Sequence, residues 1–178
     1  MKGAWIFVCG PSGAGKDSVI ASAQQTARER EDLVFARRIV TRPAQAGSDH
    51  DPVTESDFIS LVQAGRLSWH WKAHGFYYGI AQHYAADVQA GRLVVVNGSR
   101  AHVQNLPPTP DVRLVQITAD PDQLAERLAQ RGRDAASAIA DRLARNTRFT
   151  GMKVDCLIVN DAELSVAARR LTEYLTVF

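Results

Sequence analysis

The feature that most constrains the fold is a glycine-rich stretch near the amino terminus. It runs Gly-Pro-Ser-Gly-Ala-Gly-Lys from Gly10 to Lys16 and fits the phosphate-loop pattern G-x-x-x-x-G-K. An apolar run, Ala4–Cys9, precedes it, and a segment of helical composition, Asp17–Arg30, follows it. Glycines let the backbone turn its N–H groups around a phosphate, and the positive end of a helix dipole strengthens that attraction. The pattern therefore predicts a strand, a phosphate-binding loop and a helix in succession.

The loop also indicates which residues meet the nucleotide. We expect Lys16 to follow the β- and γ-phosphates during transfer. The next position, usually a Mg²⁺-binding Ser or Thr, is Asp17. A carboxylate suits a hard cation, and it also stabilises the first turn of a helix, so both interpretations stay open and Asp17 is the candidate metal ligand. The predicted nucleotide-binding residues of the loop are Gly10, Pro11, Ser12, Gly13, Ala14, Gly15, Lys16, Asp17 and Ser18.

Composition excludes several classes of protein. A chain of 178 residues, 46% hydrophobic and 22% charged, fits a single globular domain over residues 1–178. Its apolar runs, such as Leu93–Val96, are far shorter than the roughly 20 residues of a membrane span. Cys9 and Cys156 are the only cysteines, so we expect no disulfide and a cytoplasmic protein. The 17 arginines form no basic stripe interleaved with aromatics, so we expect no nucleic-acid partner and no membrane, while a homodimer stays open.

Strand-like and helical segments alternate along the chain, which predicts an α/β fold with a parallel sheet covered on both faces, a three-layer core. Leu67–Ala73 and Phe76–Tyr78, around Gly75, predict an antiparallel excursion within an inserted lobe, residues 33–80. Other predicted strands are Leu33–Thr41, Leu93–Val96, Val112–Thr118 and Cys156–Val159, with a loop over Ala44–Pro52. Predicted helices are Thr54–Ala64, capped by Thr54 and stopped by Gly65, then Ala81–Ala90, one from Pro121 and one from Ala162.

Four stretches together resemble the guanylate kinases. They are Gly10–Lys16, Thr41-Arg42-Pro43 with Ala46-Gly47, His74–Gly79 and Val159-Asn160-Asp161. The resemblance covers nearly the whole chain and implies the P-loop NTPase fold of nucleoside-monophosphate kinases, with a core, a substrate lobe at 33–80 and a lid at 127–138. It implies that Arg42 and Tyr78 bind the phosphate of the acceptor. It further implies that Arg127 and Arg131 contact the nucleotide, that Arg133 lies on the lid, and that Lys16, Arg131 and Arg142 are catalytic.

The departures from that family are informative. Gln45 stands where a second phosphate-binding arginine is expected, and the loop 48–52 lacks the family's phosphate-binding tyrosine. Ser68-Trp69-His70-Trp71 occupies the stretch of the guanine-reading glutamate, and Asn97-Gly98-Ser99-Arg100 replaces an acidic element. A guanine pocket needs acceptors for the ring N–H and amino groups, because leaving them unpaired costs discrimination. Losing an acid and gaining Arg100 favours an acceptor with more phosphate and no base.

The chain resembles more closely the ribose 1,5-bisphosphate phosphokinases of bacterial phosphonate breakdown. The resemblance rests on Lys16-Asp17-Ser18, on Val96 to His102, and on Arg127-Leu128 with Arg131-Gly132-Arg133. It implies a kinase that uses ATP and Mg²⁺ to convert ribose 1,5-bisphosphate, a phosphorylated sugar, into 5-phosphoribosyl 1-diphosphate (PRPP) and ADP. An ionised acceptor phosphate needs no general base, so positioning and charge neutralisation would carry the reaction. The predicted acceptor-binding residues are Arg42, Asp49, His50, Tyr78, Ser99 and Arg100.

Three other readings stay open at the level of the sequence. One is a small-sugar kinase, although Arg42 and Tyr78, expected to bind a phosphate, make an unphosphorylated acceptor less natural. A guanylate or other nucleoside-monophosphate kinase with an unusual pocket would read its base with another acid, such as Asp49 or Glu55. A guanylate-kinase-like binding module without catalysis needs no phosphate loop, so the intact Lys16 argues against it.

Overall fold

The computed structural model describes residues 2–44, 49–106, 109–130 and 153–178. The chain divides into two compact units. Unit 1 comprises Met1–Phe7 and Arg30–Val112, and unit 2 comprises Val8–Glu29 and Arg113–Phe178. The strand β1, Ala4–Cys9, is buried at every position and contributes its first four residues to unit 1 and its last two to unit 2.

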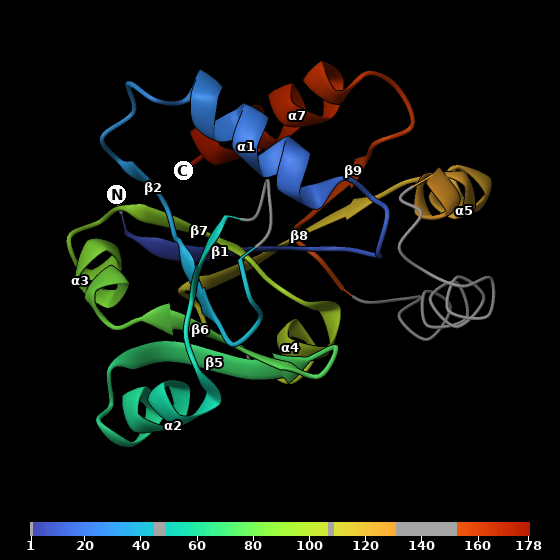
Figure 1. The fold of residues 1–178 in the computed structure, drawn as a ribbon. Helices are drawn as coiled ribbons and strands as arrows, with labels where there is room; N and C mark the ends of the chain where they lie inside the picture. Colours follow the sequence, from blue (N-terminus) through green and yellow to red (C-terminus); the bar gives the residue numbers. More distant parts are fainter. Residues whose placement is uncertain (1, 45–48, 107–108, 131–152) are drawn as a thin grey trace. The chain divides into compact units, whose positions relative to one another are not determined.

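Within the described residues, a five-stranded sheet has the order β2-β7-β1-β8-β9 (Figure 1). In unit 1, β2 (Leu33–Phe35) pairs in parallel with β7 (Leu93–Asn97), with Leu33 opposite Leu93. Four consecutive residues of β7 are buried, as expected of a central parallel strand. The helix α3 (His83–Gln89) packs on β7. Unit 1 therefore contains a parallel strand pair with α3 packed on it.

A second sheet of unit 1 has the order β4-β3-β6-β5. β5 (Leu67–Ala73) and β6 (Phe76–Ala81) form the predicted antiparallel pair around Gly75, which has φ 80°. β3 (Arg38–Val40) pairs antiparallel with β6 and parallel with β4 (His50–Pro52). The helix α2 (Glu55–Gln63) packs against β5 and β6, as Figure 1 shows. The Thr54 hydroxyl accepts from the Asp57 N–H at 3.1 Å, so the predicted cap is confirmed.

Two sequence-based element predictions in this region are wrong. Leu33–Thr41 is not one strand, because the chain leaves the first sheet after Ala36, whose N–H bonds the Val95 carbonyl. At Arg37 the backbone N–H instead donates to the Tyr84 hydroxyl, 47 residues away, and β3 then joins the other sheet. The predicted loop Ala44–Pro52 ends in the strand β4, because β3 offers a free edge for pairing.

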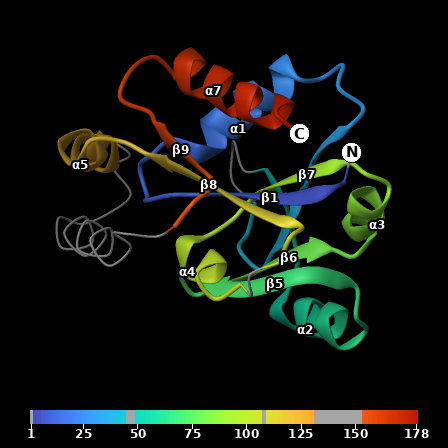
Figure 2. The ribbon, with the colours of Figure 1, turned by 180° about the vertical axis from the view of Figure 1, so that it is seen from behind.

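In unit 2, β8 (Val112–Thr118, its first residue in unit 1) pairs in parallel with β9 (Cys156–Val159), with Val115 opposite Cys156. The helices α1 (Lys16–Thr26) and α7 (Leu164–Thr176) pack side by side in both views of the ribbon (Figures 1 and 2). α5 (Pro121–Gln130) begins at the predicted proline. The buried residues of these two helices are Val19, Ala23, Ala167, Ala168, Leu171 and Leu175.

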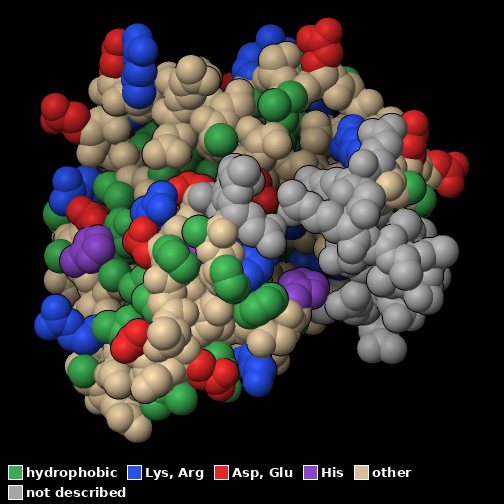
Figure 3. Space-filling model, viewed as in Figure 1, with side chains coloured by type: hydrophobic (Ala, Val, Ile, Leu, Met, Phe, Trp, Pro, Cys, Tyr) green, Lys and Arg blue, Asp and Glu red, His purple; other side chains and the backbone are tan. Residues whose placement is uncertain are grey.

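The α/β fold with a parallel sheet is confirmed, and so are most predicted elements. Three helices are shorter than expected: α1 ends at Thr26, α3 begins at His83, and α7 begins at Leu164. No helix in the described ranges is both long and apolar enough to cross a bilayer. Cys9 is buried, and Cys156 is partly exposed. On the face in Figure 3, basic and acidic side chains are interspersed.

Candidate functional site

The phosphate loop of unit 2 has the backbone that its glycines predict. Gly10, Gly13 and Gly15 all have positive φ, at 155°, 90° and 78°. At Gly10 a Cβ would lie 1.9 Å from the Ile117 carbonyl oxygen on β8, so only glycine fits. At Gly15 a Cβ would lie 2.7 Å from the Asn160 side-chain nitrogen. The loop is therefore set by its contacts with the neighbouring strands as much as by its own sequence.

Lys16 is the first residue of α1, and its side chain reaches back across the loop. Its Nζ donates to the carbonyl oxygens of Gly10, at 3.1 Å, and Pro11, at 3.2 Å. The N-cap residue Gly15 gives α1 no side-chain capping bond. The arrangement places one ammonium group and the positive end of an 11-residue helix at the same loop, which suits a polyphosphate.

Asp17 and Ser18 lie on the first turn of α1, and both are exposed. Their oxygens could therefore meet a partly hydrated Mg²⁺, which usually keeps several waters and takes one or two protein ligands. Within the ranges that the structure describes, no group of three or more His, Cys, Asp and Glu side chains has the arrangement of a metal site. The residues fit a cation shared with a bound nucleotide better than a dedicated protein cage.

Asn160, just after β9, is a residue of the loop's surroundings that we did not predict as part of the site. Its side chain is 5% exposed, and its Nδ2 donates to the Ala14 carbonyl at 2.9 Å. Its backbone N–H donates to the Thr118 carbonyl at 2.7 Å, which continues the pairing of β9 with β8. The available signal was its place after an apolar strand, in the stretch Val159-Asn160-Asp161. Asn160 thus anchors the loop to the sheet.

Arg127, a predicted nucleotide-binding residue, projects from α5 towards the same segment. Its Nη2 donates to the Asn160 carbonyl at 3.0 Å and to Gln123 Oε1 at 2.8 Å. Its Nη1 is buried without a hydrogen-bond partner among the described residues. The structure thus brings Arg127, Asn160 and the loop residue Ala14 into one chain of contacts. Arg131 and Arg133, predicted on the lid, lie outside the described residues, and so do Gln45 and Arg142, the latter predicted on the helix after the lid.

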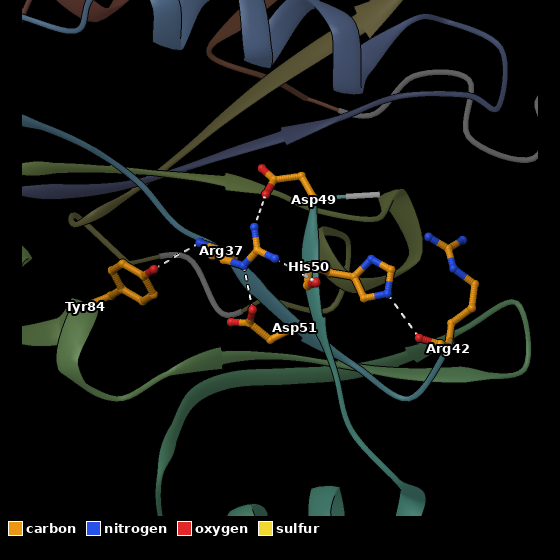
Figure 4. Close-up of polar contacts among 6 residues, drawn as sticks. All are labelled: Arg37, Arg42, Asp49, His50, Asp51 and Tyr84. Carbon is orange, nitrogen blue, oxygen red and sulfur yellow. Dashed lines mark hydrogen bonds and ion pairs between the residues drawn. The ribbon is translucent and has the colours of Figure 1, made fainter. Parts of the chain in front are cut away.

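In unit 1, the predicted acceptor residues Arg42 and His50 are in contact. Arg42 follows β3, and the His50 ring on β4 places its Nε2 3.0 Å from the Arg42 carbonyl oxygen (Figure 4). The His50 side chain is 1% exposed. The Nε of Arg42 is buried and has no hydrogen-bond partner in the described part of the chain. A buried guanidinium nitrogen without a partner suits an incoming oxyanion.

The other predicted acceptor residue of this segment, Asp49, belongs to a cluster around Arg37. The Arg37 guanidinium donates to Asp49 and to Asp51, each at 2.6 Å, and to the His50 carbonyl at 3.0 Å, as Figure 4 shows. Hydrogen bonding to Asp51 raises the pKa of Arg37 above its usual value. The cluster links Arg37, just before β3, to Asp49, just before β4, and to the first two residues of β4. It therefore fixes these two strands to each other.

Tyr78, on β6, is held in a stack of rings. It is 7% exposed and lies parallel to Trp71, with 5.5 Å between ring centroids. Trp71 stacks in turn on His102, at 4.6 Å, and the Arg38 guanidinium lies 5.9 Å from the centre of the Tyr78 ring. Such packing fixes the orientation of the Tyr78 ring, and hence of its hydroxyl.

Trp69 and His102 close the aromatic cluster. Trp69 makes edge-to-face contacts with Trp5, at 5.8 Å, and with Phe7, at 5.4 Å. Burial, followed by the charge of His70, lowers the pKa of His102 to about 4, so its ring is neutral at physiological pH. Trp69 Nε1 and His102 Nε2 are buried without hydrogen-bond partners among the described residues.

Ser99 and Arg100 follow β7 and begin the short helix α4 (Arg100–Val103). The Ser99 hydroxyl accepts from the His102 N–H at 3.2 Å, so this predicted acceptor residue is also the helix cap. Arg100 is half-buried, and α4 packs on β5. Unit 1 therefore places His50 on β4 and Tyr78 on β6, the two strands beside β3, with Arg42 two residues past the end of β3. It places Ser99 and Arg100 at the start of α4, the helix that carries His102.

The fold and the phosphate loop together define a P-loop kinase of the α/β class. The family model described as guanylate kinase matches residues 2–177. The ribose 1,5-bisphosphate phosphokinase PhnN of Burkholderia mallei is 43% identical over 145 residues, which cover 81% of this chain and 78% of that protein. The protein of the same name from Bradyrhizobium diazoefficiens is 37% identical over 97% of this chain and 88% of its own length. The chain therefore belongs to the guanylate kinase family, in its branch of ribose 1,5-bisphosphate phosphokinases.

The solved structures agree on the fold. The crystal structure of guanylate kinase from Anaplasma phagocytophilum matches with a TM-score of 0.73 and covers 98% of this chain and 85% of its own. Its sequence is 18% identical to this chain, so the similarity shows the fold alone.

Proposed function

We propose that this enzyme transfers the γ-phosphoryl group of ATP to ribose 1,5-bisphosphate and releases PRPP and ADP. Its named relatives support this choice of acceptor, and so do Arg42 and Arg100 in unit 1. The reaction would take place in the cytoplasm, where ATP is available. There it would supply PRPP during phosphonate catabolism, as the resemblance implies.

The observation that carries the proposal is the aromatic cluster beside Tyr78. Trp69, Trp71 and His102 fill this part of unit 1 with packed rings. Their buried polar atoms without a hydrogen-bond partner in the described part of the chain are an indole N–H, which can only donate, and one imidazole nitrogen. Guanine presents an N–H and an amino group that need carboxylate or carbonyl acceptors. The cluster offers no carboxylate, which favours an acceptor without a base.

The charges of the same unit favour an acceptor with more than one phosphate. Arg42 offers a buried Nε without a partner in the described residues, and Arg100 adds a second guanidinium at the start of α4. Guanidinium groups bind phosphate bidentately, and hydrogen bonds between ions are about twice as strong as neutral ones. Two such groups match the two phosphates of ribose 1,5-bisphosphate.

The chemistry then needs little from the protein beyond placement and charge. An oxygen of the 1-phosphate attacks the γ-phosphorus, a new P–O bond forms, and the bond to the β–γ bridging oxygen breaks with its electron pair leaving on ADP. The attacking phosphate is already ionised, so no general base is required. Lys16 would follow the charge on the transferring group, and we retain Arg131 and Arg142 as the catalytic arginines. Mg²⁺ held near Asp17 and Ser18 would neutralise charge between the β- and γ-phosphates.

An acceptor comparison tests the proposal. ADP release from ATP is measured with ribose 1,5-bisphosphate, GMP and ribose 5-phosphate as separate acceptors. We expect kcat/KM for the bisphosphate to exceed that for GMP by about 10³-fold or more, since unpaired polar groups of guanine would be costly to bury. A higher kcat/KM for GMP would contradict the proposal and indicate a divergent guanylate kinase.

The variant Arg100→Ala extends this test to a residue. Loss of one charge-assisted hydrogen bond should raise the acceptor KM by about 10- to 100-fold and leave the ATP KM within about twofold. Arg66→Ala, which removes an exposed arginine of unit 1, is the matched control. An unchanged acceptor KM in Arg100→Ala would remove Arg100 from the site.

A further inference from the structure

Among the described residues, His50 and Asn160 are the polar side chains buried in the core. Burying a polar ring costs free energy unless its nitrogens are hydrogen-bonded. The Nε2 of His50 lies 3.0 Å from the Arg42 carbonyl oxygen. A carbonyl oxygen can only accept, so the proton sits on Nε2 and His50 donates to Arg42. The other ring nitrogen, Nδ1, is buried without a partner in the described residues. The hydrogen bond to Arg42 is therefore the one that offsets the cost of burying the His50 ring.

His50 is itself held in place from several sides. It opens β4 and stands opposite Arg38 in the parallel pairing with β3, and the Val53 N–H bonds the Val40 carbonyl at the other end of that pairing. The Arg37 guanidinium holds the His50 carbonyl, together with the carboxylates of Asp49 and Asp51 (Figure 4). The His50 imidazole is therefore a hydrogen-bond donor in a fixed position, and it would not move with Arg42 if the Arg42 backbone shifted.

Arg42, in contrast, lies two residues beyond the end of β3, where strand pairing no longer fixes the backbone. Just before it, the Thr41 N–H donates to the Tyr77 carbonyl and the Tyr77 N–H to the Thr41 hydroxyl. The bond from His50 then fixes the Arg42 carbonyl. In Figure 4 the Arg42 side chain extends away from that bond, and its Nε is one of the buried nitrogens without a partner in the described chain. The backbone of Arg42 is thus fixed while its guanidinium remains available to an anion.

We propose that His50 is a positioning residue, which holds the backbone of Arg42 so that the guanidinium meets a phosphate of the acceptor. The proposal rests on the proposed function, since it assumes that Arg42 binds that phosphate. It assigns His50 an indirect part in acceptor binding, through Arg42, in place of a direct contact with the sugar. Because the nucleotide loop belongs to the other unit, His50 should affect the acceptor and not ATP.

Two substitutions separate the hydrogen bond from the volume of the ring. His50→Phe keeps a buried ring and removes the donor, whereas His50→Gln carries an amide N–H that reaches about as far as Nε2. We expect His50→Phe to raise the acceptor KM by about 5- to 30-fold, with the ATP KM within about twofold, and His50→Gln to restore most of that loss. His83→Phe, at an exposed histidine of unit 1, is the matched control. Circular dichroism and thermal unfolding establish that each variant is folded.

A double-mutant cycle decides whether His50 acts through Arg42. Arg42→Ala keeps the carbonyl that His50 contacts and removes the guanidinium. If His50 only positions Arg42, His50→Phe should change the acceptor KM less than twofold in the Arg42→Ala background. The inference is overturned if His50→Phe leaves the acceptor KM unchanged, if His50→Gln is as impaired as His50→Phe, or if the effect persists without the Arg42 side chain. Failure of the parent enzyme to use ribose 1,5-bisphosphate would instead contradict the proposed function.

Discussion

At the scale of the residue, Lys16 is the side chain whose charge the proposed phosphoryl transfer most depends on. Its Nζ bonds to Gly10 and Pro11 hold the ammonium over the loop before any ligand binds. We expect Lys16→Ala to lower kcat by about 10²- to 10³-fold, because it removes a preorganised charge from the transition state. Steady-state ADP release checks this, with Lys2→Ala, at an exposed lysine, as the control. A folded Lys16→Ala enzyme with nearly normal kcat would contradict the assignment of the phosphate loop.

At the scale of the element, the phosphate loop requires close contact with β8. Gly10→Ala would place a Cβ 1.9 Å from the Ile117 carbonyl, and backbone on both sides leaves little room to relax. We expect a loss of about 1–3 kcal/mol in the free energy of unfolding and at least about tenfold weaker ATP binding. Gly65→Ala is the matched control, because Gly65 also has positive φ, 63°, but its Cβ would meet nothing within 4 Å. Calorimetric ATP binding by Gly10→Ala at the parental affinity would refute this prediction.

At the scale of the whole molecule, the half-buried His102 makes the free energy of unfolding depend on pH. Burial lowers its pKa from 6.5 to about 4 in the folded protein, so below pH 6.5 the unfolded chain binds a proton that the folded chain does not. Its contribution is therefore fully present above about pH 6.5 and falls as the pH approaches about 4. For a half-buried ring we expect this contribution to the free energy of unfolding to be about 1–2 kcal/mol. Denaturant unfolding at about pH 7 and pH 4.5 should show a smaller loss in His102→Phe than in the parent or in His83→Phe; equal losses would contradict this assignment.

Local patterns predicted much of this fold. The loop Gly10–Lys16 carries its own turn chemistry, Thr54 caps its own helix, and the aromatic strands around Gly75 pair with each other. These features depend on residues near one another in the sequence, which a pattern can capture. The α/β class, the guanylate kinase family and the ribose 1,5-bisphosphate phosphokinase branch are confirmed, whereas the roles of individual site residues stay predictions.

The features that the sequence could not indicate depend on distant contacts. Asn160 meets Ala14 across 146 residues, and Tyr84 meets Arg37 across 47, which divides a predicted strand into β2 and β3. His50 was predicted in a loop that faces the acceptor, yet pairing of β4 with β3 buries it. No local periodicity encodes such partners, because each is chosen by the packing of elements that are remote in the sequence.

Phosphorus NMR of the reaction products is the most direct test of the proposed phosphoryl transfer from ATP to ribose 1,5-bisphosphate. The enzyme is incubated with ATP and Mg²⁺, with ribose 1,5-bisphosphate in one sample and GMP in another. We expect the diphosphate resonances of PRPP to grow in the first sample while GMP persists in the second. Formation of GDP in the second sample, with ribose 1,5-bisphosphate unchanged in the first, would contradict the proposed transfer.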